Sequence, residues 1–399
     1  MATPGSHRVV IAGGGFAALE AMIGLRRLAG GRVELVLVSP VRELAYPPLS
    51  VVEPFGMGEA PRFDLAAIAR DHDAELHVDA AAAVDASRRV VRTMSDGEIP
   101  YDSLLVTTGA EPHEAVPGAL TFRGSADRPA FEGLLSDIAA GRVGSVVFAV
   151  PAGTSWPLPL YELALTTAAR ADADDLAARF TVVTAESDPL GIFGNRASEA
   201  VAALLRERGI ELHTSTVPVA FERGLLSVAP DAALAADRVV ALPQLRGRAP
   251  AGLPADGHGF LPTDQHGHVR GCEDVYAAGD VTDFPVKQGG IATQQADTAA
   301  RAIAVRAGAP VEAEPFRPVL RGLLLTGDGA RFMRSQIAGG HGDSSDVSTR
   351  MLWWPETKVA GQYLSHYLSR GTEPVRPADP LPADAVPVEV NLTHAQSGT

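Results

Sequence analysis

The chain contains little cysteine and lysine, and it has no long apolar runs. Cys272 is its only cysteine among 399 residues, so the chain cannot form an internal disulfide, and a zinc site built from several thiolates is excluded. Of its 34 cationic side chains only Lys287 and Lys358 are lysines, and all the others are arginines. The net charge is −14 and the pI is near 5.2, so we expect no nucleic-acid partner.

No uninterrupted run of 18 apolar residues is present, and the polar start, residues 1–7, does not resemble a signal peptide. We therefore expect a cytoplasmic protein whose membrane contact is at most peripheral, on the inner membrane face. The apolar content of 46% and the charged content of 21% are ordinary for globular proteins of this length. A chain of this size can bury a large core without metals or disulfides, which favours an enzyme of two or three domains.

Apolar strands alternate with helical patterns twice along the chain. The first unit has strands at 7–12, 33–38, 90–93 and 104–107 and a helix at 16–28. The second has strands at 145–150 and 180–184 with a helix at 160–170, and a further helix at 199–208 follows. Strands alternating with helices predict parallel sheets covered on both faces. We expect an α/β protein with two Rossmann-type three-layer domains and a small C-terminal α+β interface domain.

The domain limits follow from these units. We expect a first part of one nucleotide-binding domain at 1–115, a second, degenerate domain at 116–245, and the return to the first domain at 246–310. An interface domain at 311–371 includes a hairpin, 323–326 with 331–334, around Gly327-Asp328-Gly329. The proline-rich residues from Thr372 onward are predicted to form a flexible tail.

The best single motif is Gly13-Gly14-Gly15-Phe16-Ala17-Ala18, a G-x-G-x-x-A that follows a strand and opens a helix. Gly13 permits the tight turn, and Gly15 lets the backbone approach a pyrophosphate. The amides of Phe16 and Ala17 at the helix N-terminus suit its negative charge. An acidic residue usually ends the second strand and binds the ribose, but Ser39 stands there; Arg42 and Glu43 are the alternatives.

Two later segments, YDSLLVTTGA at 101–110 and VYAAGD at 275–280, resemble motifs of the FAD-dependent pyridine nucleotide–disulfide oxidoreductase superfamily. The resemblance covers roughly residues 7–370 and names FAD as the cofactor. Tyr46-Pro47-Pro48-Leu49 and residues 287–297 most resemble the branch of sulfide:quinone oxidoreductases and type II NADH dehydrogenases. Carried onto this sequence, the resemblance implies FAD contacts at Pro48, Ala81, Thr108, Gly109, Gly279 and Asp280, with Asp280 on a ribityl hydroxyl.

In relatives that use NAD(P)H the second unit carries its own glycine-rich turn. Here Pro151-Ala152-Gly153-Thr154-Ser155-Trp156-Pro157 follows the strand. Proline removes backbone donors, and Trp156 fills space that a pyrophosphate needs. We therefore expect NAD(P)H binding to be poor or absent. Glu162, near the start of the next helix, is interpreted as an acid that complements the helix dipole, with a position facing the flavin as the alternative.

A lysine retained in an arginine-rich chain suggests a place where a compact point charge is needed. Lys287 resembles the flavin-edge position of relatives, where a cation and the helix N-terminus at Gly290 would stabilise negative charge on the reduced flavin. Lys358 is left between a functional and a surface role. Trp353 and Trp354 are candidates for lining the flavin's substrate side, and residues 357–369 have the apolar spacing of a packed helix.

The sequence thus predicts an FAD-dependent oxidoreductase with a non-covalent flavin and no redox-active disulfide. We expect a small-molecule donor and a quinone, oxygen or protein as acceptor. The alternatives are an NAD(P)H:acceptor oxidoreductase and an FAD-binding partner or sensor module with little turnover. A homodimer is left open. His258, His266 and His268 are interpreted as polar surface of a hairpin, so no metal is expected.

Overall fold

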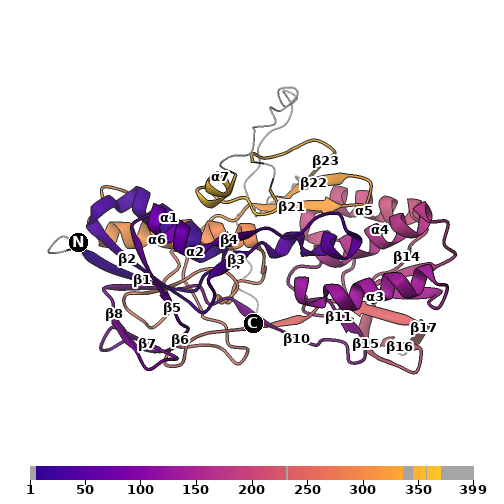
Figure 1. The fold of residues 1–399 in the computed structure, drawn as a ribbon, viewed down its shortest axis with the longest axis horizontal. Helices are drawn as coiled ribbons and strands as arrows, with labels where there is room; N and C mark the ends of the chain where they lie inside the picture. The colour runs from indigo at the N-terminus through magenta and orange to yellow at the C-terminus, as the bar shows by residue number, and fades with distance from the viewer. Residues whose placement is uncertain (1–5, 231, 336–344, 356, 370–399) are drawn as a thin grey trace.

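The structure is a computed structural model, and it describes residues 6–230, 232–335, 345–355 and 357–369. The tail predicted from Thr372 lies outside the described residues. Figure 1 shows two lobes side by side, with β21, β22 and β23 along their upper edge. The chain passes from the first lobe to the second and back on a two-stranded antiparallel ribbon, β10 (Ala110–His113) with β19 (Gln244–Gly247).

The first lobe contains a parallel five-stranded sheet in the order β20-β9-β1-β2-β5. Its strands are β1 (His7–Ala12), β2 (Val33–Ser39), β5 (Ala74–Val78), β9 (Ser103–Val106) and β20 (Val275–Ala277). Two helices, α1 (Phe16–Ala29) and α6 (Gly289–Arg306), pack together and share an apolar core with the sheet. The late strand β20 lies beside β9, so the chain returns to its first sheet before it ends.

The second lobe repeats this plan with the order β11-β18-β12-β13-β14. Its strands are β11 (Leu120–Thr121), β12 (Ser145–Val150), β13 (Arg179–Thr184), β14 (Glu211–His213) and β18 (Arg238–Ala241). Its helices are α3 (Arg128–Ala139), α4 (Leu158–Ala173) and α5 (Asn195–Glu207). The predicted class, α/β with two Rossmann-type sheets, is confirmed.

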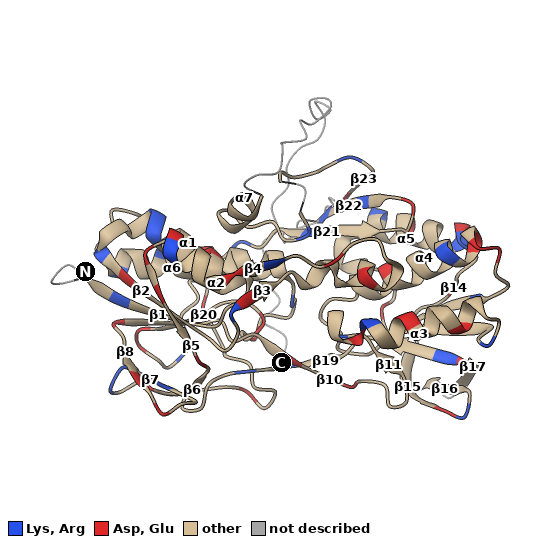
Figure 2. Cartoon of the chain, in the orientation of Figure 1, with Lys and Arg blue, Asp and Glu red and all other residues tan. Residues whose placement is uncertain are grey.

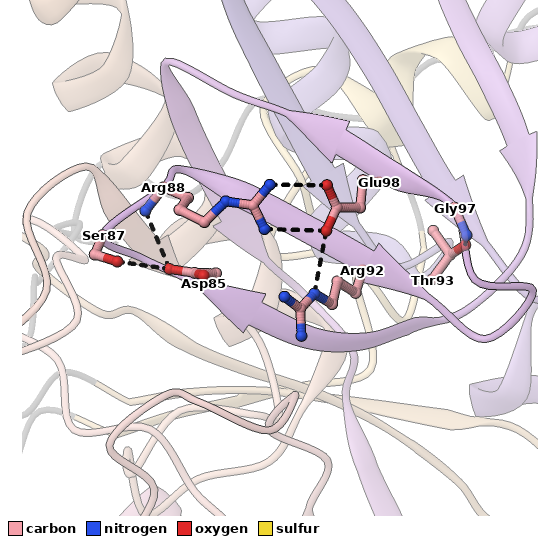
Figure 3. A network of polar contacts seen from close by, with 7 residues as sticks. All are labelled: Asp85, Ser87, Arg88, Arg92, Thr93, Gly97 and Glu98. Carbon is pink, nitrogen blue, oxygen red and sulfur yellow. Dashed lines mark hydrogen bonds and ion pairs between the residues drawn. The ribbon is translucent and has the colours of Figure 1, made fainter.

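One strand was assigned to the wrong sheet. Residues 90–93 form β7 (Val90–Thr93) of a separate antiparallel sheet with β6 (Ala81–Asp85) and β8 (Glu98–Pro100). Short turns join these strands, and a short turn permits only antiparallel pairing. Figure 3 shows its polar surface, where Arg88 binds both carboxylate oxygens of Glu98 at 3.1 and 3.0 Å. Because these groups are exposed, we expect the pair to add little stability.

Shorter elements complete the fold around the two large sheets. They are β3 (Glu43–Ala45), β4 (Arg62–Asp64), α2 (Leu65–Asp71), β15 (Val217–Glu222), β16 (Leu225–Ala229) and β17 (Ala232–Ala235). A 3-10 segment, Pro47–Phe55, begins after the first lobe's β3 and packs its apolar residues into the core of the second lobe. The two lobes therefore share buried surface as well as the connecting ribbon.

The C-terminal sheet consists of β21 (Leu320–Leu325), β22 (Ala330–Ser335) and β23 (Ser345–Ser348), which confirms the predicted hairpin. The helix expected at 357–369 is much shorter, α7 (Leu364–Leu368). The first residues of that segment contact distant parts of the chain. Lys358 pairs with Glu162 of α4, and the Val359 N–H donates to the Tyr46 hydroxyl at 2.9 Å. These tertiary contacts outweigh the apolar spacing that favoured a longer helix.

Candidate functional site

A cavity of about 360 Å³ lies where the two lobes and the C-terminal sheet meet. Its wall is built from segments distant in sequence. They include the glycine turn before α1, the start of the Pro47–Phe55 segment, the 151–157 loop with the start of α4, the 278–289 segment that leads into α6, and residues 358–359. β21 contributes Arg321, Gly322 and Leu323. The N-terminal ends of α1, α4 and α6 therefore all contribute residues to one cavity.

The glycine turn has the shape that a phosphate ligand requires. Gly13 has a φ of +138°, and a Cβ placed there would lie 2.3 Å from the Thr107 carbonyl oxygen, so only glycine fits. Gly15 caps α1 without any side chain, and a Cβ at Gly15 would meet nothing within 4 Å. Gly15, Phe16 and Ala17 line the cavity. The turn thus leaves open space in front of helical amides, as an anion site needs.

The structure gives Ser39 a role in the turn. Its side chain is fully buried, and its hydroxyl donates to the Val41 carbonyl at 2.9 Å. A Cβ at Gly14 would lie 2.3 Å from the Ser39 oxygen, so the serine supports the glycine turn from behind. Arg42 and Glu43 are both exposed at the same end of β2, and Glu43 pairs with Arg62 at 3.6 Å.

The late motif places Asp280 in the cavity wall. Gly279, with a φ of +82°, ends the strand and donates its N–H to the Gln295 side chain at 2.8 Å. Burial raises the pKa of Asp280, and the nearby charge of Lys287 acts in the opposite direction. The structure thus brings Gly15 and Asp280 to the same cavity, although 264 residues separate them (280 − 15 − 1).

The other expected FAD contacts are divided. Pro48 and Gly109 line the cavity. Thr108 lies next to the wall, and its hydroxyl donates to the Arg248 carbonyl at 2.6 Å. Ala81 begins β6 and is not among the lining residues, and Gly290 sits in the first turn of α6, one residue beyond the lining Gly289.

Lys287 lies in the wall and is 8% exposed. Its ammonium donates to the Thr282 carbonyl and lies 4.0 Å from the centroid of the Phe260 ring. Burial lowers the pKa of Lys287 to about 8, although the charges of Asp280, Asp283 and Asp256 oppose that shift. The lysine predicted at this place is therefore at the cavity, and its charge state changes near neutral pH.

The second lysine lies in the same cavity, which sequence reasoning had left undecided. The Lys358 ammonium contacts both carboxylate oxygens of Glu162, at 2.6 and 2.7 Å. One of these oxygens also accepts the Leu325 N–H at 2.9 Å. Glu162 is 1% exposed and lies beyond the first turn of α4, so its interpretation as a helix-end acid is wrong. Burial raises the pKa of Glu162, and the charge of Lys358 opposes this effect.

Both lysines of the chain thus line one cavity. The scarcity of lysine was the signal in the sequence that pointed to Lys287, and it applied equally to Lys358. Tyr46 had no such signal, yet its hydroxyl accepts the Val359 N–H and its ring packs edge-on against Phe16 at 5.2 Å. Burial raises the pKa of Tyr46 to about 12.

The tryptophans behave differently from each other. Trp156, from the loop that replaces a second glycine turn, lines the cavity and packs edge-on against Phe193 at 5.6 Å. Trp353 and Trp354 do not line it. Trp353 donates its indole N–H to the Thr357 carbonyl at 2.9 Å and packs edge-on against Phe332, and Trp354 is 47% exposed.

The acid that follows β13 in the second lobe is hydrogen-bonded within that lobe. The carboxylate of Glu186, which follows β13, accepts hydrogen bonds from the Tyr161 hydroxyl at 2.7 Å and the Thr184 hydroxyl at 2.9 Å. An acid at the end of this strand is the group that would bind a ribose. Here Tyr161 and Thr184 of the same lobe bind the Glu186 carboxylate. Two prolines, Pro157 and Pro159, lie at the start of α4.

Cys272 packs beside the apolar cluster under the first sheet, and burial raises the pKa of its thiol. This favours the thiol form over the reactive thiolate. Within residues 6–230, 232–335, 345–355 and 357–369, no group of three metal-ligating side chains is present. Over the same residues, no helix is both long enough and apolar enough to span a membrane.

Comparison with known proteins identifies the class. The family model for pyridine nucleotide-disulphide oxidoreductases matches residues 7–303, and the chain belongs to this family of flavin oxidoreductases. The family typically binds FAD. The resemblance to this family, predicted from the three motifs at 13–18, 101–110 and 275–280, is therefore confirmed.

The individual proteins that this chain resembles share between 20% and 31% of their aligned residues with it. A mercuric reductase from Acidithiobacillus ferrooxidans is 31% identical over 217 residues, which is 50% of this chain and 35% of that protein. The chain thus spans about a third of that relative's length. The sulfide:quinone oxidoreductase of Aquifex aeolicus has a similar fold, with a TM-score of 0.76, 20% identity, and coverage of 86% of this chain and 87% of that chain. A ferredoxin reductase from Rhodopseudomonas palustris follows at a TM-score of 0.66, 21% identity and 84% of each chain.

Proposed function

We propose that this protein is an oxidoreductase that binds FAD non-covalently in the described cavity. It takes two electrons from a small-molecule donor other than NAD(P)H and passes them to a quinone, to oxygen or to a protein. The observation that carries the proposal is the convergence of Gly15, Asp280 and Lys287 on one cavity, to which the N-terminal ends of α1, α4 and α6 contribute. When bound, the flavin supplies reversible two-electron transfer, and the chain positions it and tunes its potential.

The residues present fit this cofactor. The turn at Gly13 and Gly15 offers open amides for the pyrophosphate, and Asp280 offers a carboxylate for a ribityl hydroxyl. Pro48, Gly109 and the start of α6 around Gly290 form the remaining walls near the ring system. Thr108, beside the lining Gly109, and Ala81, which does not line the cavity, stay expected FAD contacts from the resemblance, and Arg42 is the exposed group left for the adenosine ribose.

Charged residues at the far end of the cavity suit electron transfer. Lys287 supplies a positive charge, as the resemblance implies for the flavin edge. The Glu162–Lys358 pair holds an exchangeable proton between a carboxylate and an ammonium at the cavity wall. In our proposal the pair moves the proton that accompanies electron transfer: the Lys358 ammonium delivers it, or the Glu162 carboxylate accepts it. Trp353 and Trp354 have no part in this scheme.

Two features support a donor other than NAD(P)H and a path without cysteine. Trp156 and two prolines occupy the second nucleotide turn, and Tyr161 holds Glu186. A single half-buried cysteine in a thiol-favouring setting cannot form a disulfide relay within the chain.

The visible spectrum of the purified protein, followed by anaerobic titration with NADH, NADPH and sulfide, tests the proposal. We expect a yellow protein that none of the three donors reduces within seconds. Rapid bleaching by NADH or NADPH would establish the NAD(P)H:acceptor alternative. A protein that takes up no FAD would overturn the assignment. Slow reduction by every donor together with a stable protein complex would favour the sensor module.

A further inference from the structure

Charge is unevenly compensated around the cavity. Four cationic residues line it: Arg123, Lys287, Arg321 and Lys358. Arg123 pairs with Asp127 at 3.3 Å, Lys358 with Glu162, and Lys287 lies in the field of Asp280. Across the described part of the chain, neither Lys287 nor Arg321 forms an ion pair within 4.0 Å. Lys287 has acidic neighbours, however, whereas the charge that shifts the pKa of Arg321 is that of another cation, Arg334.

The two arginines are direct neighbours. β21 and β22 are antiparallel with Arg321 opposite Arg334, so both side chains project from the same face of the sheet. Figure 2 shows basic residues on these two strands. Burial and the charge of Arg334 both lower the pKa of Arg321, and the buried Nε of Arg334 has no hydrogen-bond partner. The residue opposite Arg334 on β23 is Asp346, which is exposed and forms no ion pair with it within 4.0 Å.

Like charges placed opposite each other in a sheet destabilise the fold. Half-buried guanidinium groups without a partner add a desolvation penalty. Such an arrangement is stabilised when a negatively charged ligand binds, because guanidinium groups form strong, paired hydrogen bonds to oxyanions. The arginine pair therefore has the chemistry of an anion site that the protein itself does not fill.

Arg321 lies at the part of the cavity that the start of α6 also lines. The Arg321 carbonyl accepts a hydrogen bond from Gln288 at 3.2 Å, which ties β21 to the N-terminus of α6, the Lys287 end of the cavity. The cavity as a whole has many apolar wall residues, among them Val51, Phe122, Trp156, Leu158 and Leu323. An occupant of this end needs an apolar body and one anionic group.

We propose that Arg321, supported by Arg334, binds the anionic group of the small organic molecule that exchanges electrons at this cavity. The ligand class is an apolar or aromatic molecule that carries a carboxylate or a comparable oxyanion. This inference rests on the proposed function, since it names the substrate class of the same site. It predicts that a neutral molecule of the same shape binds more weakly.

The test is calorimetric titration of the flavin-loaded protein with three anionic probes, benzoate, benzenesulfonate and phenylphosphonate, and with neutral benzamide. We expect at least one anion to bind about ten-fold or more tightly than benzamide. Arg321→Gln should remove that preference, and Arg321→Lys should restore part of it. The matched control is Arg331→Gln, from the same hairpin but outside the cavity wall; it should leave all affinities unchanged.

Three results would overturn the inference. The first is that no anion binds the wild-type protein more tightly than benzamide does. The others are that Arg321→Gln leaves the preference for anions intact, or that it weakens the binding of benzamide as much as the binding of the anions. The last result would indicate a structural arginine. Failure of the protein to hold FAD would refute the proposed function. Bound FAD without any anion preference would refute this inference only.

Discussion

Replacing Lys358 by methionine removes one charge of the buried pair and leaves Glu162 in place. The side chains of the pair are 6% and 1% exposed, and the ammonium lies within 2.7 Å of both carboxylate oxygens. Removing one partner of a buried pair strands the other charge in a low-dielectric site, which costs about 3–5 kcal/mol. We expect Lys358→Met to lower the free energy of unfolding by that amount.

The same helix offers a matched control. Arg170 and Asp174 on α4 are also 2.6 Å apart, but their side chains are 57% and 44% exposed. Water screens such a pair, so it contributes about 0.3–0.5 kcal/mol. Arg170→Met should therefore change the stability several-fold less than Lys358→Met, although the two ion pairs have the same length.

The loss in Lys358→Met should depend on pH. Without the lysine, only the Leu325 N–H still opposes the effect of burial, so the pKa of Glu162 rises further. A carboxyl whose folded pKa is raised stabilises the fold at low pH, and that stability is lost as the pH rises through the folded pKa. The deficit relative to the wild type should thus be larger at pH 8 than at pH 5.5. In Glu162→Gln/Lys358→Met no buried charge remains, so most of the lost stability should return.

Urea unfolding of the four proteins at the two pH values, followed by tryptophan fluorescence, measures these quantities. The argument fails if Lys358→Met and Arg170→Met lose equal stability. It also fails if the double variant is as unstable as Lys358→Met, because the stranded charge would then not be the cause.

Three further outcomes are expected. Gly15→Ala should leave the stability of the FAD-free protein within about 0.5 kcal/mol of the wild type, because its Cβ meets nothing within 4 Å. The same variant should weaken FAD binding about ten-fold or more. Gly13→Ala, at a φ of +138°, should instead lower the stability by about 1–3 kcal/mol. Melting curves of the FAD-free proteins and FAD titrations check this pair, and equal FAD affinity in Gly15→Ala and wild type would contradict it. Lys287→Met should lower the two-electron potential of the bound flavin by about 30 mV, or about 1.4 kcal/mol, and the difference should shrink above pH 8 because the pKa of Lys287 is about 8. A spectroscopic redox titration that shows no shift at pH 6.5 would count against the lysine's role. Burial, and then the charge of Glu20, raise the pKa of Asp297 from 3.8 to about 9, so the stability this carboxyl contributes is complete below pH 3.8 and is lost as the pH rises through about 9. Asp297→Asn should remove a slope of up to about 1.4 kcal/mol per pH unit, seen in unfolding at pH 5, 6.5 and 8; parallel pH profiles for variant and wild type would refute this.

The elements that local sequence specifies were predicted well. The glycine turn lies between β1 and α1 because Gly13 and Gly15 have no side chains to occupy the turn. This property can be read from the six residues 13–18 alone. The hairpin at β21 and β22 follows from apolar runs around a glycine-rich turn. Periodicity failed at 90–93 and 357–363, where partners elsewhere in the chain decide the pairing and the path of the backbone.

Sequence alone thus determined the fold class, the family and the cofactor motifs, because each depends on residues near one another in the chain. It also singled out Lys287, by the rarity of lysine. Only the tertiary structure showed that Lys358 meets Glu162 across 196 residues and that Arg321, a cavity residue, lies opposite Arg334 in the C-terminal sheet. Whether a buried charge is paired depends on which distant segments pack around it, and no local pattern contains that information.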